Sequence, residues 1–342
     1  MLLTGILPLI KNDNWTFRIF DYPRVQKLVI CIALLVGWNF YGQASLESWE
    51  LFLPILLVVM VLYLIVQIFP FTPLAKRMVQ STRKLEGGPD LHVMVMNVYQ
   101  YNTDYDKVIT LLKNENPDLF LLVETDHHWA NAIAVFKKDY PYFIEIPLDN
   151  TYGMLFYSKN EILSNKINYL VDEDIPSLET LTRLPNGQAV KIFSIHPMPP
   201  VPQENPRSTE RDAEILLVGK MVKAYQKPAI VIGDLNDVGW SYTSNLFLKT
   251  SGLLDPRRGR GMYSTFHAKY FFLRWPLDHI FVTKHFTLDK LTVHGPVGSD
   301  HFPISATFTL DRENNNQKME SDPEAEHIAE EKIEDGLAEN EK

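Results

Sequence analysis

The feature that most limits how this chain can fold is an apolar run of 21 residues, 51–71, whose only polar residue is Gln67. At about 1.5 Å per residue, a helix of this length spans the hydrocarbon core of a bilayer. A shorter apolar run precedes it at 28–40 and contains Asn39. Beside a span, the shorter run is interpreted as the first arm of a helical hairpin, which predicts helices at about 28–42 and 51–71.

Basic residues on both sides of this hairpin predict its orientation. The connection at 41–50 has no lysine or arginine, whereas the flanks carry Lys11, Arg18, Arg24, Lys27, Lys76, Arg77, Arg83 and Lys84. The positive-inside rule then puts both flanks in the cytoplasm. We therefore expect a multi-pass membrane region at 1–75, bound to the lipid bilayer through the hairpin, followed by a linker at 76–90.

Charge and cysteine content restrict the class of protein further. The net charge is −9, of which −8 falls in the tail 311–342, with 12 acidic against 4 basic residues. This tail is poor in large apolar residues, so we expect it to be disordered. The rest of the chain is nearly neutral, which argues against binding dominated by attraction to polyanions. The single cysteine, Cys31, excludes an intramolecular disulfide and a thiolate metal cluster.

Between 91 and 310 the chain alternates short apolar strands with amphipathic helical segments. Runs such as LHVMVMNVY, DLFLLVE and AIVIGDLND are typical of strands, and STERDAEILLVGKMVKAYQ is typical of a helix. An α/β chain with more strands than helices predicts a two-sheet sandwich with outer helices. We expect 91–310 to form one domain.

Polar side chains stand at one end of six of these strands. They are Asn97, Glu124, His196, Asp234, Asn236, Asp278, Asp300 and His301. Taken singly, each is more often an ordinary turn or surface residue, because polar residues concentrate in loops. Together they supply hard oxygen ligands and imidazoles, which Mg²⁺-assisted phosphoryl chemistry requires. Since strand ends in a sandwich can converge on one rim, the pattern predicts a shared pocket.

Six short stretches also resemble a known family. MNVYQ, LLVETD, FSIHP, VIGDLND, LDHIFV and GSDHFP are similar, in order and approximate spacing, to motifs of the endonuclease/exonuclease/phosphatase superfamily, which includes pancreatic deoxyribonuclease and neutral sphingomyelinases. HPMPP, RSTERDAE and TFHAKYFFLRWPLDH resemble its bacterial membrane-anchored members. The resemblance covers 91–310. It implies a four-layer α/β/β/α sandwich of the deoxyribonuclease I type and a location in the bacterial inner membrane.

The resemblance implies a metal site and a cation. The residues matching the family's metal ligands are Asn97, Glu124 and Asp300. Mg²⁺ is the implied cation and Mn²⁺ the alternative. Carboxylate oxygens, waters and a phosphate oxygen suit such a small octahedral cation.

The resemblance also implies roles in catalysis. Asp234 matches the residue that orients or deprotonates the attacking water, and Asn236 matches the one that binds a phosphate oxygen of the substrate. His196 and His301 match the histidines that donate hydrogen bonds to the developing charge. Asp278 matches the acid that pairs with His301 and raises its pKa.

Several charged residues are open to two interpretations. Arg207 and Arg211 are candidate substrate-binding residues, or else charges at the start of a helix. The basic cluster of Arg257, Arg258 and Arg260 either contacts a phosphate substrate or belongs to a solvated loop.

Two further residues share this ambiguity. Glu179 is a candidate to support the earlier histidine, with an uncertain register. Tyr152 either lines the pocket or packs at a strand edge.

The chemistry predicts a membrane-anchored, Mg²⁺-dependent phosphoester hydrolase but leaves the substrate open. Nucleic acid, a phospholipid and a small phosphoester all fit, and the hairpin would keep the site near lipid headgroups. No protein partner is inferred. The alternative is a catalytically inactive membrane-tethered binding or scaffold protein with the same fold. The complete set of polar strand-end residues argues against that alternative.

Overall fold

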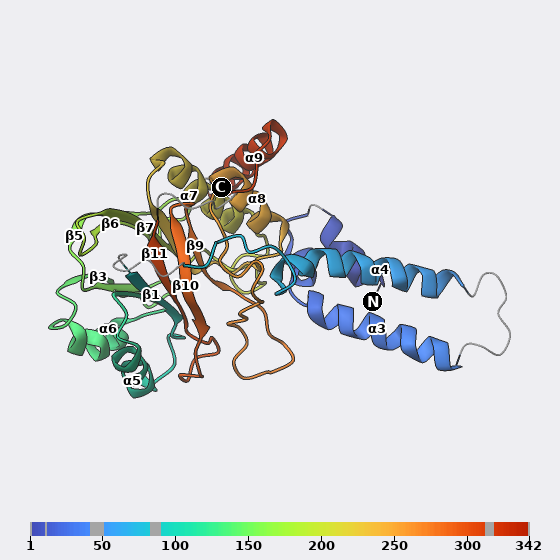
Figure 1. Cartoon of the computed structure of the whole chain (residues 1–342), viewed down its shortest axis with the longest axis horizontal. Helices are drawn as coiled ribbons and strands as arrows, with labels where there is room; N and C mark the ends of the chain where they lie inside the picture. Colours follow the sequence, from blue (N-terminus) through green and yellow to red (C-terminus); the bar gives the residue numbers. More distant parts are fainter. Residues whose placement is uncertain (1, 11, 42–50, 83–89, 312–317, 341–342) are drawn as a thin grey trace.

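The computed structural model describes residues 2–10, 12–41, 51–82, 90–311 and 318–340 (Figure 1). Two β-sheets stack face to face. The six-stranded sheet has the order β10-β11-β1-β2-β4-β3 and the five-stranded sheet the order β5-β6-β7-β8-β9. The strands are β1 Asp90–Asn97, β2 Leu119–Val123, β3 Tyr142–Ile146, β4 Met154–Ser158, β5 Ile162–Asn168, β6 Ser177–Arg183, β7 Ala189–Ile195, β8 Ala229–Asp234, β9 Asp278–Val282, β10 Phe286–Val293 and β11 Ile304–Leu310.

Alternate side chains of each central strand pack into two different hydrophobic cores. In β1, Val93 and Val95 belong to the core between the sheets, whereas Met94 and Met96 pack under the helices α5 (Tyr105–Glu115) and α6 (His127–Ile133). This follows from the two-residue period of a strand. With both faces covered, such strands appear in the sequence as continuous apolar runs.

The other sheet is covered in the same way on its outer face. Phe193 and Val231 pack against α7 (Thr209–Tyr225) and α8 (Tyr242–Ser251). The layers are therefore helix, sheet, sheet, helix, as Figure 1 shows for α5 and α6 on one side and α7 and α8 on the other. The predicted two-sheet sandwich with outer helices is confirmed.

The prediction of a disordered tail is wrong for most of its length. Residues 323–340 form the helix α9 (Pro323–Asn340), which packs along α7. Ala325, Ala329 and Ile333 recur every four residues on one face and are buried in the outer core of the second sheet. Small residues at this spacing let an acidic helix lie close to a neighbour, although its composition resembles that of a disordered segment.

We expect Ile333→Asp to lower the free energy of unfolding by about 3 kcal/mol, because it places a charge against this apolar core. The matched control is Leu337→Asp, which changes a residue of the same helix that is 40% exposed. Urea denaturation of both variants measures the difference. Equal stability of the two variants would mean that α9 does not pack as described.

The two N-terminal helices form an antiparallel hairpin that projects from one side of the sandwich (Figure 1). They are α3 (Arg24–Tyr41) and α4 (Phe52–Ile68), the latter continued by the 3-10 turn Phe69–Phe71. Among the described residues one helix, Phe52–Phe71, is long and apolar enough to cross a membrane. Its mean hydropathy is 2.8 over a stretch of 18 residues. The predicted second span is not supported, so a multi-pass region is not established.

The predicted domain boundaries need correction on both sides of the hairpin. Residues 13–24 are built into the sandwich domain: Trp15 N donates to Pro206 O and Ser208 N to Asp13 O. Of the predicted linker, 80–82 is bound to the first sheet, because Ser81 forms a bridge with Leu288 of β10 and Thr82 N donates to the carbonyl of Leu288. The segment 83–89 lies outside the described residues.

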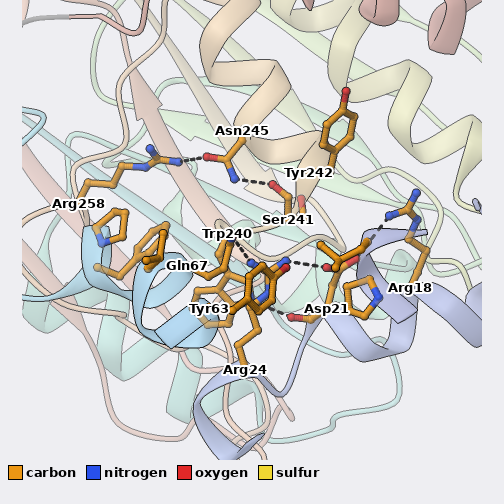
Figure 2. A pocket seen from close by; sticks show the side chains of 15 residues that line it. Arg18, Asp21, Arg24, Tyr63, Gln67, Trp240, Ser241, Tyr242, Asn245 and Arg258 are labelled. Carbon is orange, nitrogen blue, oxygen red and sulfur yellow. Dashed lines mark hydrogen bonds and ion pairs between the residues drawn. The ribbon is translucent and has the colours of Figure 1, made fainter. Parts of the chain in front are cut away.

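Figure 2 shows the junction at the base of the hairpin. Asp21 lies between two buried arginines and accepts from Arg24 Nη2 at 2.8 Å, while Arg18 Nη1 is 3.5 Å from its other oxygen. Trp240 Nε1 donates to the carbonyl of Asp21 at 2.8 Å. Arg24 also donates to Gln67, the one polar residue of the apolar run. Two of the flanking charges used to predict orientation are therefore internal partners of the fold.

Candidate active site

The polar strand ends meet at one rim of the sandwich. β1 and β2 are parallel, as are β7 and β8, so each pair ends at the same edge. β11 is antiparallel to β1, and β9 is antiparallel to β8, which brings the beginnings of β11 and β9 to that edge. Asp278 and Asp234 are direct partners in this register. Strand pairing within each sheet and the packing of the two sheets together gather side chains that are up to 204 residues apart, from Asn97 to His301.

Asn97 holds two carboxylates together across the two sheets. Its Nδ2 donates to Glu124 Oε1 at 2.7 Å and to Asp234 Oδ2 at 3.0 Å. Its Oδ1 accepts from Tyr99 N at 2.9 Å. In this geometry the amide nitrogen faces the site and the amide oxygen is occupied by the backbone. Asn97 thus links the two acids, and its expected role as a metal ligand stays a prediction.

His301 lies between two aspartates. Its Nδ1 is 2.8 Å from Asp278 Oδ2, and its Nε2 is 3.6 Å from Asp234 Oδ2. Burial alone would lower the pKa of His301, but the two carboxylates outweigh it and raise the pKa to about 10. The ring is therefore an imidazolium at neutral pH, and both of its nitrogens are donors.

His196 lies on the other side of Asp234 and has the opposite charge state. Its Nε2 is 3.9 Å from Asp234 Oδ2, and its buried Nδ1 has no hydrogen-bond partner. Burial lowers its pKa to about 4, so this histidine is neutral at pH 7. A buried nitrogen without a partner is costly.

Asp234 carries the negative charge at the centre of this group. Its Oδ1 accepts from the backbone N of Asn236 at 3.0 Å. Burial alone would raise its pKa, but His301 and His196 hold the pKa below its usual range. The carboxylate is 1% exposed and stays ionised.

Glu124 and Asp300 have the properties of cation ligands. Both are partly exposed and line the same cavity, whereas Asp234 is fully buried. Burial raises the pKa of Glu124 to about 7 against the effect of its hydrogen bond from Asn97. A carboxylate desolvated beside other acids needs a nearby positive charge, and hard oxygen donors of this kind suit Mg²⁺. The residues present therefore fit a divalent cation.

A second group of potential metal ligands overlaps the first. Atoms of Asp234, Asp278 and His301 lie within 4.8 Å of one another. An imidazolium bound between two carboxylates already satisfies the charges of this group, and it has no lone pair for a metal. The expected binding of the cation by Glu124 and Asp300 stays a prediction.

The loop after β8 places two further groups at the rim. A Cβ on Gly233 would lie 1.8 Å from Ile195 O, so only glycine lets β8 approach β7 this closely before Asp234. Asn236 has a left-handed backbone with φ +49°, and Glu124 has φ +58°. Such conformations in non-glycine residues are costly and concentrate at functional sites. Asn236 Nδ2 donates to Pro197 O at 3.0 Å and keeps a second N–H for the pocket.

The two arginines predicted to bind substrate do not reach the pocket. Arg207 is exposed and pairs with Glu339 of α9. Arg211 is 2% exposed and is bound by Asp212 at 2.7 Å. Its Nη1 donates to the carbonyl of Asn236 at 2.7 Å, so it supports the catalytic loop from behind. The prediction of substrate contact is not supported for either residue: Arg207 precedes α7 and pairs with α9, and Arg211 is buried within the domain.

The basic cluster also has internal partners. Arg257 is buried against Asp255, Arg258 donates to Asn245, and Arg260 donates to the carbonyl of Val79. These arginines tie the segment after α8 to neighbouring elements. They form no phosphate-binding track at the described pocket.

Glu179 and Tyr152 have different outcomes. Glu179 pairs with Lys191 on the neighbouring strand and does not support His196. Tyr152 lines the cavity, with its ring centroid 5.4 Å from that of His196. Its hydroxyl donates to Glu204.

The cavity above these residues has a volume of about 480 Å³. Its lining includes Glu124, His196, Asp234, Asn236, Asp300 and His301, with apolar side chains from three other segments. One of these segments was missed in the sequence, because Trp15, Ile19 and Tyr22 precede the hairpin and were assigned to the membrane region. The only signal was the aromatic content of WTFRIFDYP, which equally suits an interfacial helix.

The comparisons with known proteins agree with this fold. The model of the Endonuclease/Exonuclease/phosphatase family matches residues 94–301. Humanized TDP2 from D. rerio is 18% identical, with a TM-score of 0.54 over 64% of this chain and 99% of that chain. D. rerio TDP2 complexed with a single-strand DNA product is 19% identical, with a TM-score of 0.54 over the same shares.

A bacterial structure is similarly related. The endonuclease/exonuclease/phosphatase from Beutenbergia cavernae is 18% identical, with a TM-score of 0.53 over 65% of this chain and 72% of that chain. At these identities the structures show a shared fold. No curated protein matches the chain.

Proposed function

The chain belongs to the endonuclease/exonuclease/phosphatase family, whose metal-dependent phosphoester hydrolysis it shares, and we propose that it acts with Mg²⁺ held by Glu124 and Asp300, which line the cavity. When bound, the cation would neutralise charge on a phosphate oxygen. The observation that carries the proposal is the placement of ionised Asp234 between a neutral and a charged histidine in one cavity.

Asp234 is the group we propose to accept the proton of the attacking water. Its low pKa keeps it ionised, and Asn97 and the backbone of Asn236 fix both of its oxygens. A fixed carboxylate beside a water orients that water for in-line attack on phosphorus.

The two histidines and Asn236 surround the place of the phosphate. His301 is held in its charged form by Asp278 and donates from Nε2 to a phosphate oxygen as negative charge develops. The neutral His196 lines the same cavity and offers a second contact. The free N–H of Asn236 Nδ2 provides a third donor.

We also propose that α4 anchors the enzyme to a membrane. The support is the apolar length of Phe52–Phe71, of which only 22% is buried by the rest of the chain. The cytoplasmic placement of the enzyme and its bacterial inner-membrane location stay predictions from the sequence.

The test of the hydrolytic function is a metal titration with a nitrophenyl phosphodiester. We expect EDTA to remove the activity and Mg²⁺ to restore it. Glu124→Gln should lower the rate about a hundredfold and raise the Mg²⁺ concentration needed, because one ligand charge is lost. The matched control, Glu161→Gln, removes a surface acid paired with Arg183 and should behave as wild type.

A metal-independent result would favour the inactive binding or scaffold protein. In that case EDTA, Mg²⁺ and the Glu124→Gln substitution would all leave the same background rate.

A further inference from the structure

The cavity is polar at its floor and apolar on its walls. The floor consists of the carboxylates and imidazoles described above. The walls are formed by a proline-rich loop, by the segment before the hairpin and by the segment before β9; their apolar members are Pro199, Pro200, Val201, Pro202, Trp15, Ile19, Phe266, Leu273, Trp275 and Leu277. In the part of the chain described, no lysine or arginine lines this cavity. The cavity can therefore bind a phosphate at its polar floor and an uncharged group along its apolar walls.

The wall before the hairpin is fixed to the catalytic loop. Tyr22 OH donates to the carbonyl of Asn236 at 2.8 Å, and the Tyr22 ring packs edge-on against Trp275 at 5.7 Å. The neighbouring Asp21 is held by Trp240 and Arg24 at the junction shown in Figure 2. This wall is therefore a rigid part of the site. It leads directly into α3, which begins at Arg24.

The rim of the cavity on the hairpin side carries exposed aromatic residues. Phe271 is 79% exposed and Phe272 is 58% exposed, next to Leu273 of the wall. Gln26 Nε2 of α3 donates to the carbonyl of Phe272 at 2.8 Å, so this rim is joined to the base of the hairpin. Contiguous exposed apolar groups beside an apolar helix mark a surface that meets lipid or another apolar partner.

We infer that the cavity takes an amphiphilic phosphoester, a phospholipid, with its phosphate at the floor and its apolar chain along the wall of Trp15, Ile19 and Trp275. This inference rests on the proposed hydrolytic function and names its substrate class. A nucleic acid is disfavoured because its phosphate backbone needs a basic track, and the arginines of the basic cluster are bound elsewhere. The continuity of wall, rim and hairpin places the mouth of the cavity beside the bilayer surface.

The test uses three phosphodiesters that share one leaving group. The full chain in lipid nanodiscs with Mg²⁺ is given the 4-nitrophenyl esters of methyl phosphate, octyl phosphate and thymidine 5′-phosphate. We expect kcat/KM for the octyl ester to exceed that for the methyl ester about a hundredfold, because several methylene groups of the octyl chain move from water to the apolar wall of the cavity. The thymidine ester should not exceed the methyl ester by more than about tenfold.

Variants of the wall locate the discrimination. Trp15→Ala and Ile19→Ala should each lower the octyl-to-methyl ratio of kcat/KM about tenfold, mainly through KM for the octyl ester. Ile19 is 49% exposed, so its truncation does not threaten folding. The control Leu163→Ala changes a residue of β5, an edge strand of the five-stranded sheet. It should leave the octyl-to-methyl ratio of kcat/KM unchanged.

Two outcomes separate the inference from the function beneath it. Equal kcat/KM for all three esters, or a preference for the thymidine ester, overturns the lipid assignment while hydrolysis stands. Absence of Mg²⁺-dependent turnover with every ester overturns the hydrolytic function itself, and the substrate assignment with it.

Discussion

Replacing Asp234 by asparagine is expected to lower kcat about a thousandfold, the usual range for losing a positioned general base. The substitution keeps the size of the side chain, and its amide oxygen still accepts one of the two hydrogen bonds that Asp234 accepts from Asn97 Nδ2 and Asn236 N. It removes the charge that faces His196 and His301. The effect should therefore fall on the chemical step, with little change in KM. Single-turnover kinetics with the nitrophenyl esters measure it.

The matched control for this experiment is Asp289→Asn. Asp289 is exposed on β10, an edge strand, and the same atoms are exchanged there. We expect wild-type kcat from the control and thermal melting of both variants close to that of the wild type. If Asp234→Asn retained more than about a tenth of the wild-type kcat, another group would have to accept the proton.

The site could be located from the sequence because its members end or begin strands. A strand end is visible as a polar residue closing an apolar run, as at Asn97 and Glu124. Parallel pairing then brings such ends to one edge without any detailed knowledge of side-chain contacts. The direction of each side chain is a different matter, and Asn97 turns out to present its nitrogen to the carboxylates.

Features that depend on packing between distant segments could not be predicted in this way. The acidic tail folds as α9 only because α7 offers an apolar face for Ala325 and Ala329. The segment around Trp15 has the composition of a membrane interface and becomes a cavity wall only through backbone contacts with residues near 206. In both cases the deciding partner lies more than a hundred residues away, beyond the reach of any local pattern.

Arg211 is the residue for which the structure changes the expected role most. The prediction from the sequence was contact with substrate, and the structure encloses its side chain between Asp212 and Asp237, at 2.7 and 3.6 Å. Burial alone would raise the pKa of Asp212, but Lys332 and Arg211 hold it well below its usual range. Both aspartates are buried, so they depend on these cations.

We expect Arg211→Met to lower the free energy of unfolding by about 3–5 kcal/mol, because it removes a buried cation that Asp212 and Asp237 share. The catalytic loop should also loosen, since the carbonyl of Asn236 loses the donor Nη1. Urea denaturation at pH 7 measures the stability. The loss should shrink below about pH 4, where the unfolded state protonates its carboxylates and the benefit of the ionised form in the fold is lost.

Arg207, an exposed arginine just before the same helix, is the matched control. Arg207→Met exchanges the same atoms at a side chain that is 59% exposed and paired only with Glu339 among its described contacts of opposite charge. We expect its stability to change by less than about 1 kcal/mol. A substrate-binding role would give the reverse pattern, with normal stability and a raised KM for Arg211→Met. Arg211→Met should be less stable than the wild type, and Arg207→Met should match the wild type in stability and in KM. The pair therefore distinguishes support of the catalytic loop from contact with the phosphate.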